Sequence, residues 1–186
     1  MRILLVNGMD PANPQAGGAE VHITEIFSRF VARGDEVTLV SSGFRGSSRH
    51  DHHRGIRIIR TGTRETFNFL APRLMKKLDA RCDFDIVVED INKVPIFTPL
   101  FLKKPVLVVI PHLFGGAVFR ETNAVLASYV YLMEKPIPRV YRHSIFEVIS
   151  ESTARDIERR GIDPGRVMVV HCGMDHAAYH DDTARR

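Results

Sequence analysis

The chain has 186 residues and a formal net charge of +4 at pH 7; 44% of its residues are hydrophobic and 26% are charged. This length and composition are typical of one soluble domain with its own core. They exclude a membrane-spanning chain, because no apolar run approaches the ~20 residues of a membrane span. The first residues already read as a strand, which argues against a signal peptide.

Cysteine usage indicates the compartment. Cys82 and Cys172 lie far apart in the sequence and match no metal-binding or redox spacing. We therefore expect reduced thiols in a cytoplasmic protein. Peripheral contact with the inner face of the membrane stays open as an alternative.

The first stretch of the chain reads as a strand, a glycine loop and a helix. Residues 2–7 form an apolar run of strand length, and after Gly17-Gly18 the apolar residues recur at helical spacing up to residue 31. The loop thus lies at the carboxyl end of a strand and the amino end of a helix, where N–H groups and the helix dipole favour an anion. Gly17 and Gly18 are a candidate phosphate or carboxylate cradle; the alternative is that they only form the turn.

The rest of the chain alternates between strand and helix patterns. We expect strands over residues 36–40, 56–61, 85–89, 105–110, 144–149 and 166–170, and helices over 65–80, 120–134 and 154–160. Residues 41–55 read as a flexible polar loop. Its histidines, His50, His52 and His53, lack a carboxylate or cysteine partner, so we interpret them as loop residues rather than metal ligands. Either Ser150 or Ser152 is expected to cap the last helix.

This alternation predicts an α/β fold: a Rossmann-like, doubly wound, mainly parallel sheet of about six or seven strands with helices on both faces. Ligands of such folds bind at the carboxyl ends of the strands. Four polar groups follow predicted strands, namely Gly17-Gly18, Glu89-Asp90, His112 and Ser150. Their shared position predicts a single site at one edge of the sheet.

The segment from Arg45 to Arg81 is strongly basic. Such a surface attracts phosphorylated small molecules or anionic lipid, and no nucleic-acid motif accompanies it. A solvated basic face without a partner is the alternative. The predicted helix 65–80 either lies on a membrane surface or packs its apolar stripe on the sheet. Pro72 is expected to kink this helix or to set a new first turn.

Several blocks of sequence resemble one enzyme family when they are taken in order. They are Gly17-Gly18-Ala19-Glu20, Arg33-Gly34-Asp35-Glu36-Val37, His112 after a buried strand, Ile149-Ser150-Glu151-Ser152, Gly161-Ile162 and Val167 to Asp175. Together they resemble the amino-terminal domain of a family 4 glycosyltransferase, from Met1 to about Asp175. Enzymes of that family have the GT-B fold, in which two Rossmann-like domains enclose the active site.

The resemblance implies transfer of a sugar from a nucleotide diphosphate sugar, with retention at the anomeric carbon. It assigns Gly17 and Gly18 to the donor diphosphate, and it places the catalytic residue His112 near the transferred sugar. The further candidates for substrate binding are Glu20, Glu89, Asp90 and Ser150. The resemblance implies no metal and no cofactor other than the nucleotide sugar, which is a co-substrate.

The sequence also departs from the family pattern. Leu113 stands where the family often has an acidic residue, and His171-Cys-Gly-Met-Asp175 stands where it often has Asn-Gly-Val-Asp. The donor-binding domain, with a basic residue and two glutamates separated by seven residues, is not found in this sequence. We therefore assign residues 1–172 to an acceptor-side domain and 173–186 to the start of an interdomain linker. We expect negligible transfer without a C-terminal partner half.

Other interpretations stay open. A non-catalytic binding or regulatory module would use the same crevice for a phosphorylated ligand. An unrelated small Rossmann-like enzyme is less favoured, because the sequence has neither Gly-x-Gly-x-x-Gly nor Gly-x-Ser-x-Gly. The partners expected for the transferase are a nucleotide-sugar donor, an acceptor of unknown or lipid-linked kind, and a second copy that covers an exposed cleft face.

Overall fold

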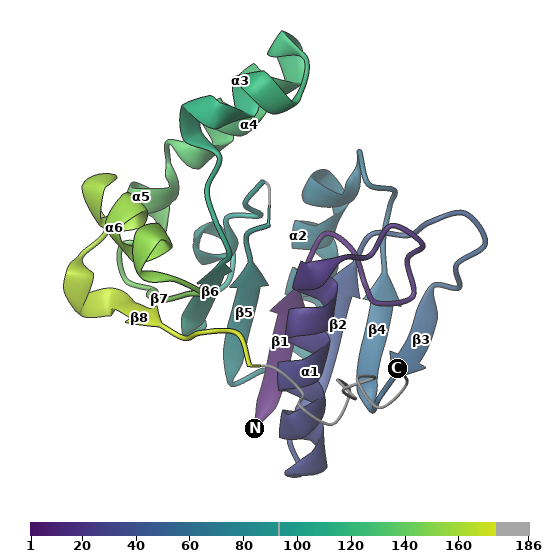
Figure 1. Ribbon diagram of the computed structural model, residues 1–186. Coiled ribbons are helices and arrows are strands. Elements are labelled where there is room, and N and C mark those ends of the chain that lie inside the picture. Colours follow the sequence, from purple (N-terminus) through teal and green to yellow (C-terminus); the bar gives the residue numbers. More distant parts are fainter. Residues whose placement is uncertain (93, 174–186) are drawn as a thin grey trace, which may run out of the picture.

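The computed structural model of the protein describes residues 1–92 and 94–173. Its centre is one eight-stranded sheet in the order β3-β4-β2-β1-β5-β6-β7-β8 (Figure 1). The strands are β1 (Arg2–Val6), β2 (Glu36–Ser41), β3 (His50–His53), β4 (Ile56–Arg60), β5 (Ile86–Asp90), β6 (Val106–Ile110), β7 (Ile145–Val148) and β8 (Val167–Val169). Neighbouring strands are parallel except β3 and β4, which are antiparallel. The predicted Rossmann-like, mainly parallel α/β fold is confirmed.

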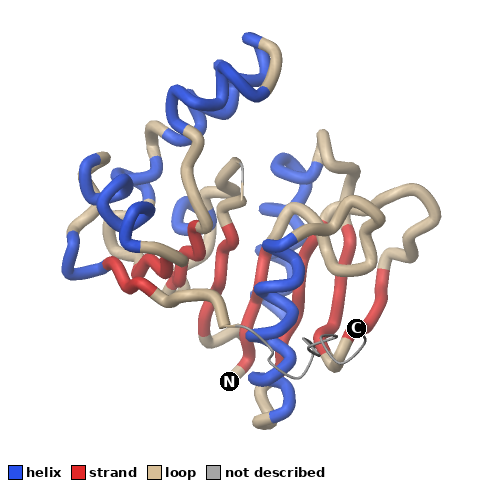
Figure 2. Tube along the Cα trace, viewed as in Figure 1, coloured by secondary structure: helices blue, strands red, loops and turns tan. Residues whose placement is uncertain are grey.

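Helices lie on both sides of this sheet (Figure 2). The α-helices are α1 (Gly18–Ala32), α2 (Phe67–Cys82), α3 (Val118–Glu121), α4 (Ala124–Glu134), α5 (Ile137–Val140) and α6 (Glu151–Arg159). Single turns of 3-10 helix are η1 (Thr98–Leu100), η2 (Gly115–Ala117) and η3 (Pro164–Arg166). Residues 174–186 of the predicted linker 173–186, with Asp175 of the last sequence block, lie outside the described residues.

Two hydrophobic clusters cover the two faces of the sheet. Along β1, Ile3 and Leu5 point to the face that α1 covers, whereas Leu4 and Val6 point to the face covered by α2, α5 and α6. Side chains alternate in this way because successive residues of a strand face opposite sides. The strands are almost continuously apolar because both faces are buried.

The predicted loop over residues 41–55 is wrong in its second half. His50–His53 form β3, which pairs antiparallel with β4 at the edge of the sheet. The two strands are joined by Arg54 and Gly55, whose φ angles are +49° and +81°. A two-residue turn with both φ angles positive matches the twist of a β-hairpin. The strand was missed because His-Asp-His-His has no apolar residue that would indicate it.

The predicted helix 120–134 is two helices. Helix α3 ends at Glu121, and α4 begins at Ala124 after Asn123, whose side-chain oxygen accepts the N–H of Leu126 at 3.0 Å. An asparagine in this position replaces the missing helical acceptor and begins a new helix. Helix α6 likewise begins at Glu151, three residues before the predicted start, because Ser150 caps it.

Helix α2 faces the sheet rather than solvent. Its residues Phe67, Met75 and Leu78 are buried, while Phe69 is 72% exposed. Pro72 lies inside one continuous helix that begins at Phe67, so it does not set a new first turn. The apolar stripe of this helix is therefore part of the core. In the described part of the chain, every helix is too short or too polar to cross a membrane.

Candidate functional site

The glycine loop leads from β1 into α1 at the carboxyl edge of the sheet. The N–H of Gly17 donates to Glu20 Oε2 at 2.7 Å, and Asn7 Nδ2 donates to Glu20 Oε1 at 2.9 Å. Glu20 is buried, and both of its oxygens are occupied in this way. The N–H of Gly18 has no acceptor among the described residues. Gly18, rather than Gly17, is the part of the predicted cradle that is open to a ligand.

Glu89 lies on the α2 face of β5 and is fully buried. Its carboxylate accepts five hydrogen bonds, which come from the backbone N–H groups of Ile96, Phe97 and Thr98 and from the hydroxyls of Thr98 and Tyr141. Burial and the charge of Glu89 raise the pKa of Tyr141 well above its usual value. Glu89 therefore anchors the 96–98 segment, and its oxygens are occupied.

Asp90 points to the opposite face, toward α1. It is 7% exposed, and neither of its carboxyl oxygens has a hydrogen-bond partner among the described residues. Burial, helped by the negative charge of Glu20, raises the pKa of Asp90 to about 7. Nearby, His22 Nε2 of α1 lies 3.7 Å from Glu147 Oε1 of β7, and the carboxylate of Glu147 raises the pKa of His22. Asp90 thus has two ionisable neighbours that the sequence did not single out.

His112 lies in the exposed loop that follows β6. Its ring packs edge-on against Phe114, with 4.6 Å between the ring centroids. Buried Glu134 holds this loop: its Oε1 accepts the N–H of Phe114 and its Oε2 the N–H of Gly115, both at 2.8 Å. Arg160 Nη1 pairs with Glu134 Oε2 at 3.0 Å, and a Cβ on Gly115 would lie 2.8 Å from Arg160. The histidine is therefore accessible. Its loop is fixed by Glu134 of α4 and by Arg160 at the end of α6.

Ser150 occupies the end of β7 and caps α6. Its Oγ accepts the N–H of Thr153 at 3.2 Å, as predicted for one of the two candidate serines. Thr153 Oγ1 in turn donates to the carbonyl of Pro111 at 3.1 Å, next to His112. The structure thus brings Ser150 and His112 to neighbouring loops of one edge.

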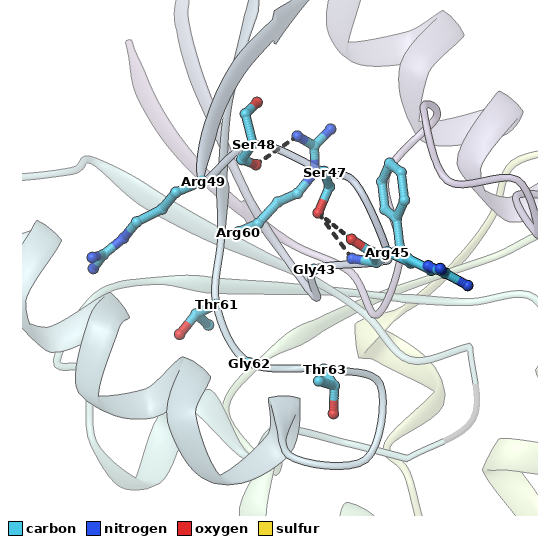
Figure 3. A pocket seen from close by; sticks show the side chains of 10 residues that line it. Gly43, Arg45, Ser47, Ser48, Arg49, Arg60, Thr61, Gly62 and Thr63 are labelled. Atoms are coloured by element: carbon cyan, nitrogen blue, oxygen red, sulfur yellow. Dashed lines mark hydrogen bonds between the residues drawn. The ribbon is translucent and has the colours of Figure 1, made fainter.

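A pocket of about 500 Å³ lies at the carboxyl ends of β2 and β4 (Figure 3). Residues 43–45, 47–49 and 60–63 line it. Arg45 and Arg49 stand on opposite sides of the pocket and direct their guanidinium groups outward. Neither has an acidic partner within 4 Å among the described residues. Part of the predicted basic segment therefore borders a concave, partly polar surface.

Arg60 at the base of this pocket belongs to a buried ion pair. Its Nε and Nη2 donate to the two oxygens of Asp10 at 2.7 and 2.8 Å, and both residues are almost fully buried. Arg60 also donates to Asp51 and to the carbonyl of Ser48, while Ser41 Oγ donates to Asp10. The loop after β1 and the loop before β3 are thus tied to the end of β4.

Sequence reasoning missed the residues that hold these loops. For Glu147, which faces His22, its place as a charged residue inside the apolar strand Ile145-Phe-Glu147-Val was a usable signal for a half-buried polar group. For Asp10 and Glu134, nothing local distinguishes them from exposed acids. In residues 1–92 and 94–173, no cluster of three or more histidine, cysteine or acidic side chains has the geometry of a metal site.

The comparisons with known proteins agree on the fold. Residues 16–178 match the family model of Glycosyltransferase Family 4. A comparison with curated protein sequences gives no match. Sucrose-phosphate synthase from Thermosynechococcus elongatus aligns with a TM-score of 0.70 and 16% identity, over 94% of this chain and 48% of that one. A glycosyltransferase from Rickettsia africae aligns with a TM-score of 0.67 and 13% identity, over 98% of this chain and 47% of that one. Anabaena HepE in complex with UDP-glucose aligns with a TM-score of 0.64 and 15% identity, over 99% of this chain and 47% of that one.

These observations identify the class of protein. The parallel sheet with its loops gathered at one edge is the Rossmann-like half of a GT-B fold, and the chain spans about half the length of the structures it matches. The family model covers more than half of the chain. The chain therefore belongs to Glycosyltransferase Family 4, as the amino-terminal domain.

Asp90 should make stability depend on pH. Below its unfolded-state pKa of ~3.9 it is protonated in both states, so its burial costs no ionisation energy. Between about pH 4 and pH 7 only the unfolded state loses the proton, so the free energy of unfolding should fall by ~2–4 kcal/mol and then level off. Asp90→Asn removes this dependence.

Thermal unfolding of Asp90→Asn and wild type between pH 4 and pH 7 tests whether Asp90 causes this pH dependence of stability. The stability difference between them should move in favour of the variant from pH 4 to pH 7. The exposed Glu121→Gln serves as the control for loss of a carboxylate. A difference that does not change with pH would show that Asp90 ionises normally in the folded protein.

Removal of either member of the Asp10–Arg60 ion pair should lower the free energy of unfolding markedly. Asp10→Ala or Arg60→Ala leaves a buried charge with fewer partners, which typically costs ~3–5 kcal/mol. The double variant should lose less than the sum of the two single variants. Urea unfolding measures all three. The exposed pair Arg54 and Glu25 is the matched control, for which removal should cost ~1 kcal/mol or less; equal costs for the two pairs would contradict the prediction.

Proposed function

We propose that this chain is the acceptor-side domain of an enzyme that transfers a sugar from a nucleotide diphosphate sugar to an acceptor. The family match over residues 16–178 is the observation that supports this most directly. The UDP-glucose in the HepE complex supports the donor class by analogy.

In this proposal Gly18, His112 and Asp90, at the carboxyl edge of the sheet, contact the substrates. The leaving diphosphate gains negative charge, which the N–H of Gly18 and the amino end of α1 stabilise. His112 donates a hydrogen bond to a sugar hydroxyl or accepts one from it, because a neutral imidazole has one donor nitrogen and one acceptor nitrogen. The unpartnered oxygens of Asp90 accept a hydrogen bond from a further hydroxyl of the substrate.

The other candidate residues act indirectly in the proposal. Gly17, Glu20, Glu89 and Ser150 already have partners within the domain, so they shape the loops that meet the substrate. The chain by itself supplies one side of the reaction centre. We therefore expect negligible transfer until a donor-binding half is present, on the same polypeptide or as a second one.

The rim of the pocket favours an anionic ligand, because Arg45 and Arg49 stand there with exposed guanidinium groups. Exposed guanidinium groups without an acidic partner are suited to phosphate or carboxylate, which they bind with paired N–H donors. In the transferase this ligand would be the acceptor. In the second candidate function, a non-catalytic binding module, the same pocket would hold a phosphorylated ligand without chemistry.

His112→Ala tests the proposed catalytic role. In an enzyme assembled with its donor-binding half and screened with uridine, guanosine and adenosine diphosphate sugars, it should lower turnover at least ~10-fold. Its melting temperature should change little, because the side chain is exposed. His143→Ala, an exposed histidine just before β7 at the opposite edge, is the matched control. Unchanged turnover in His112→Ala would remove the histidine from the reaction.

Arg45→Ala/Arg49→Ala tests the pocket. With glucose 6-phosphate, glucose and inorganic phosphate as probes in calorimetric titrations, the phosphate-bearing probes should bind wild type and bind the double variant ~10-fold or more weakly. The exposed Arg57→Ala is the control for loss of a positive charge. Equal binding of glucose and glucose 6-phosphate, or full binding by the double variant, would contradict an anion-binding pocket. Phosphate binding without sugar transfer by the assembled enzyme would favour the non-catalytic module.

A further inference from the structure

The α3–α4 hairpin presents an unusual concentration of exposed apolar side chains. In Figure 1 it extends away from the sheet, beyond the loop that follows β6. We call the exposed apolar side chains of this hairpin the hairpin surface; they are Phe119, Val125, Leu126, Tyr129, Tyr131 and Leu132. Val125 is 83% exposed and Leu132 is 58% exposed. Large contiguous apolar patches are rare on monomeric soluble proteins and usually mark an interaction site.

The hairpin has only a small core to hold its inner side. Val118, Ala127 and Val130 form this cluster, and Val94 and Phe114 pack against it from the body of the domain. The six side chains of the hairpin surface do not belong to this cluster. Residues 124–133 nevertheless contain no charged side chain. A run of ten residues on an exposed helix without a charge is not explained by folding alone.

The residues around this surface favour a lipid headgroup region as its partner. The ring centroids of Phe119 and Tyr131 lie 6.0 Å apart, and Lys135 Nζ lies 4.8 Å from the Tyr131 ring centroid. Tyrosines with an apolar ring and a polar tip are enriched at membrane interfaces. Exposed basic residues lie in α3 and just after α4, namely Arg120, Lys135, Arg139 and Arg142, and Glu121 beside Arg120 is an exposed acid.

The size and shape of the surface argue against a second copy of the chain. A standard protein interface uses roughly 20–30 residues on each side, and this surface offers six large side chains on a projecting helix pair. A projecting apolar tip with basic neighbours is suited to insertion among lipid headgroups and acyl chains. Burial of the apolar face and attraction to anionic lipid would then act together.

We propose that the α3–α4 hairpin docks this domain on an anionic lipid bilayer. The hairpin surface enters the headgroup boundary, and Arg120, Lys135 and their basic neighbours contact the lipid phosphates. The loop of His112 then lies next to the membrane, because it leads directly into η2 and α3. This proposal does not depend on sugar transfer and concerns a surface other than α2, whose apolar stripe is buried in the core.

Vesicle co-sedimentation of the purified chain tests this directly. Wild type should sediment with vesicles of phosphatidylcholine mixed with phosphatidylglycerol and bind vesicles of phosphatidylcholine alone more weakly. Val125→Asp/Leu132→Asn should reduce the bound fraction at least ~10-fold. Raising NaCl from about 0.1 M to about 0.5 M should weaken binding, since the electrostatic attraction is screened.

Phe69→Asp is the matched control, because Phe69 is as exposed as the hairpin residues but lies on α2. It should bind vesicles as wild type does, and thermal unfolding should show that all variants fold. Wild-type chain that stays in the supernatant, or a hairpin variant that still sediments, would overturn the proposal. Light scattering that shows a dimer lost only in the hairpin variant, without vesicle binding, would assign the surface to a second copy instead.

Discussion

Buried carboxylates that accept backbone N–H groups hold the loops at the carboxyl edge of the sheet. Glu20 holds the glycine loop, Glu89 holds the segment before η1, and Glu134 holds the loop of His112. Asp10 acts similarly on its own loop, with Arg60 as its counter-ion. Hydrogen bonds to an ionised acceptor are stronger than neutral ones, and loss of the acceptor leaves several donors unpaired at once. This edge of the sheet is therefore shaped by Glu20, Glu89, Glu134 and Asp10, whose charges are satisfied inside the domain.

Asp90 is the contrasting case. It is buried like Glu89, one residue away on the same strand, but neither of its oxygens has a donor within the described residues. Glu89 is stabilised by five hydrogen bonds, whereas Asp90 lies near the negative charges of Glu20 and Glu147. A buried polar group without a partner lowers stability, so proteins retain such groups mainly where function requires them. This difference makes Asp90, rather than Glu89, the stronger candidate to meet a substrate.

The fold class was predictable because it depends on local periodicity. Apolar runs of strand length alternate with helical stripes, and this pattern survives in the structure with boundaries shifted by one to three residues. Strand β3 was not predictable from apolar pattern, although Arg54-Gly55 was a turn signal. The site was harder to predict, because its hydrogen bonds join residues far apart in sequence, such as Asp10 with Arg60 and Glu89 with Tyr141. The separation of Glu89 from Asp90 onto opposite faces did follow from strand alternation and could have been read from the sequence.

Strand β3 also bears on how these molecules behave at high concentration. An outermost strand presents unpaired backbone groups to which another polypeptide can add, and this addition is a route to fibrous aggregates. Strand β3 is only four residues long, and all four side chains are histidine or aspartate. Short length and polar side chains make it a poor template for such growth. The strand that sequence periodicity failed to indicate therefore protects one of the two open edges of the sheet. Replacing the histidines of β3 with valines is expected to shorten the shelf life of concentrated solutions.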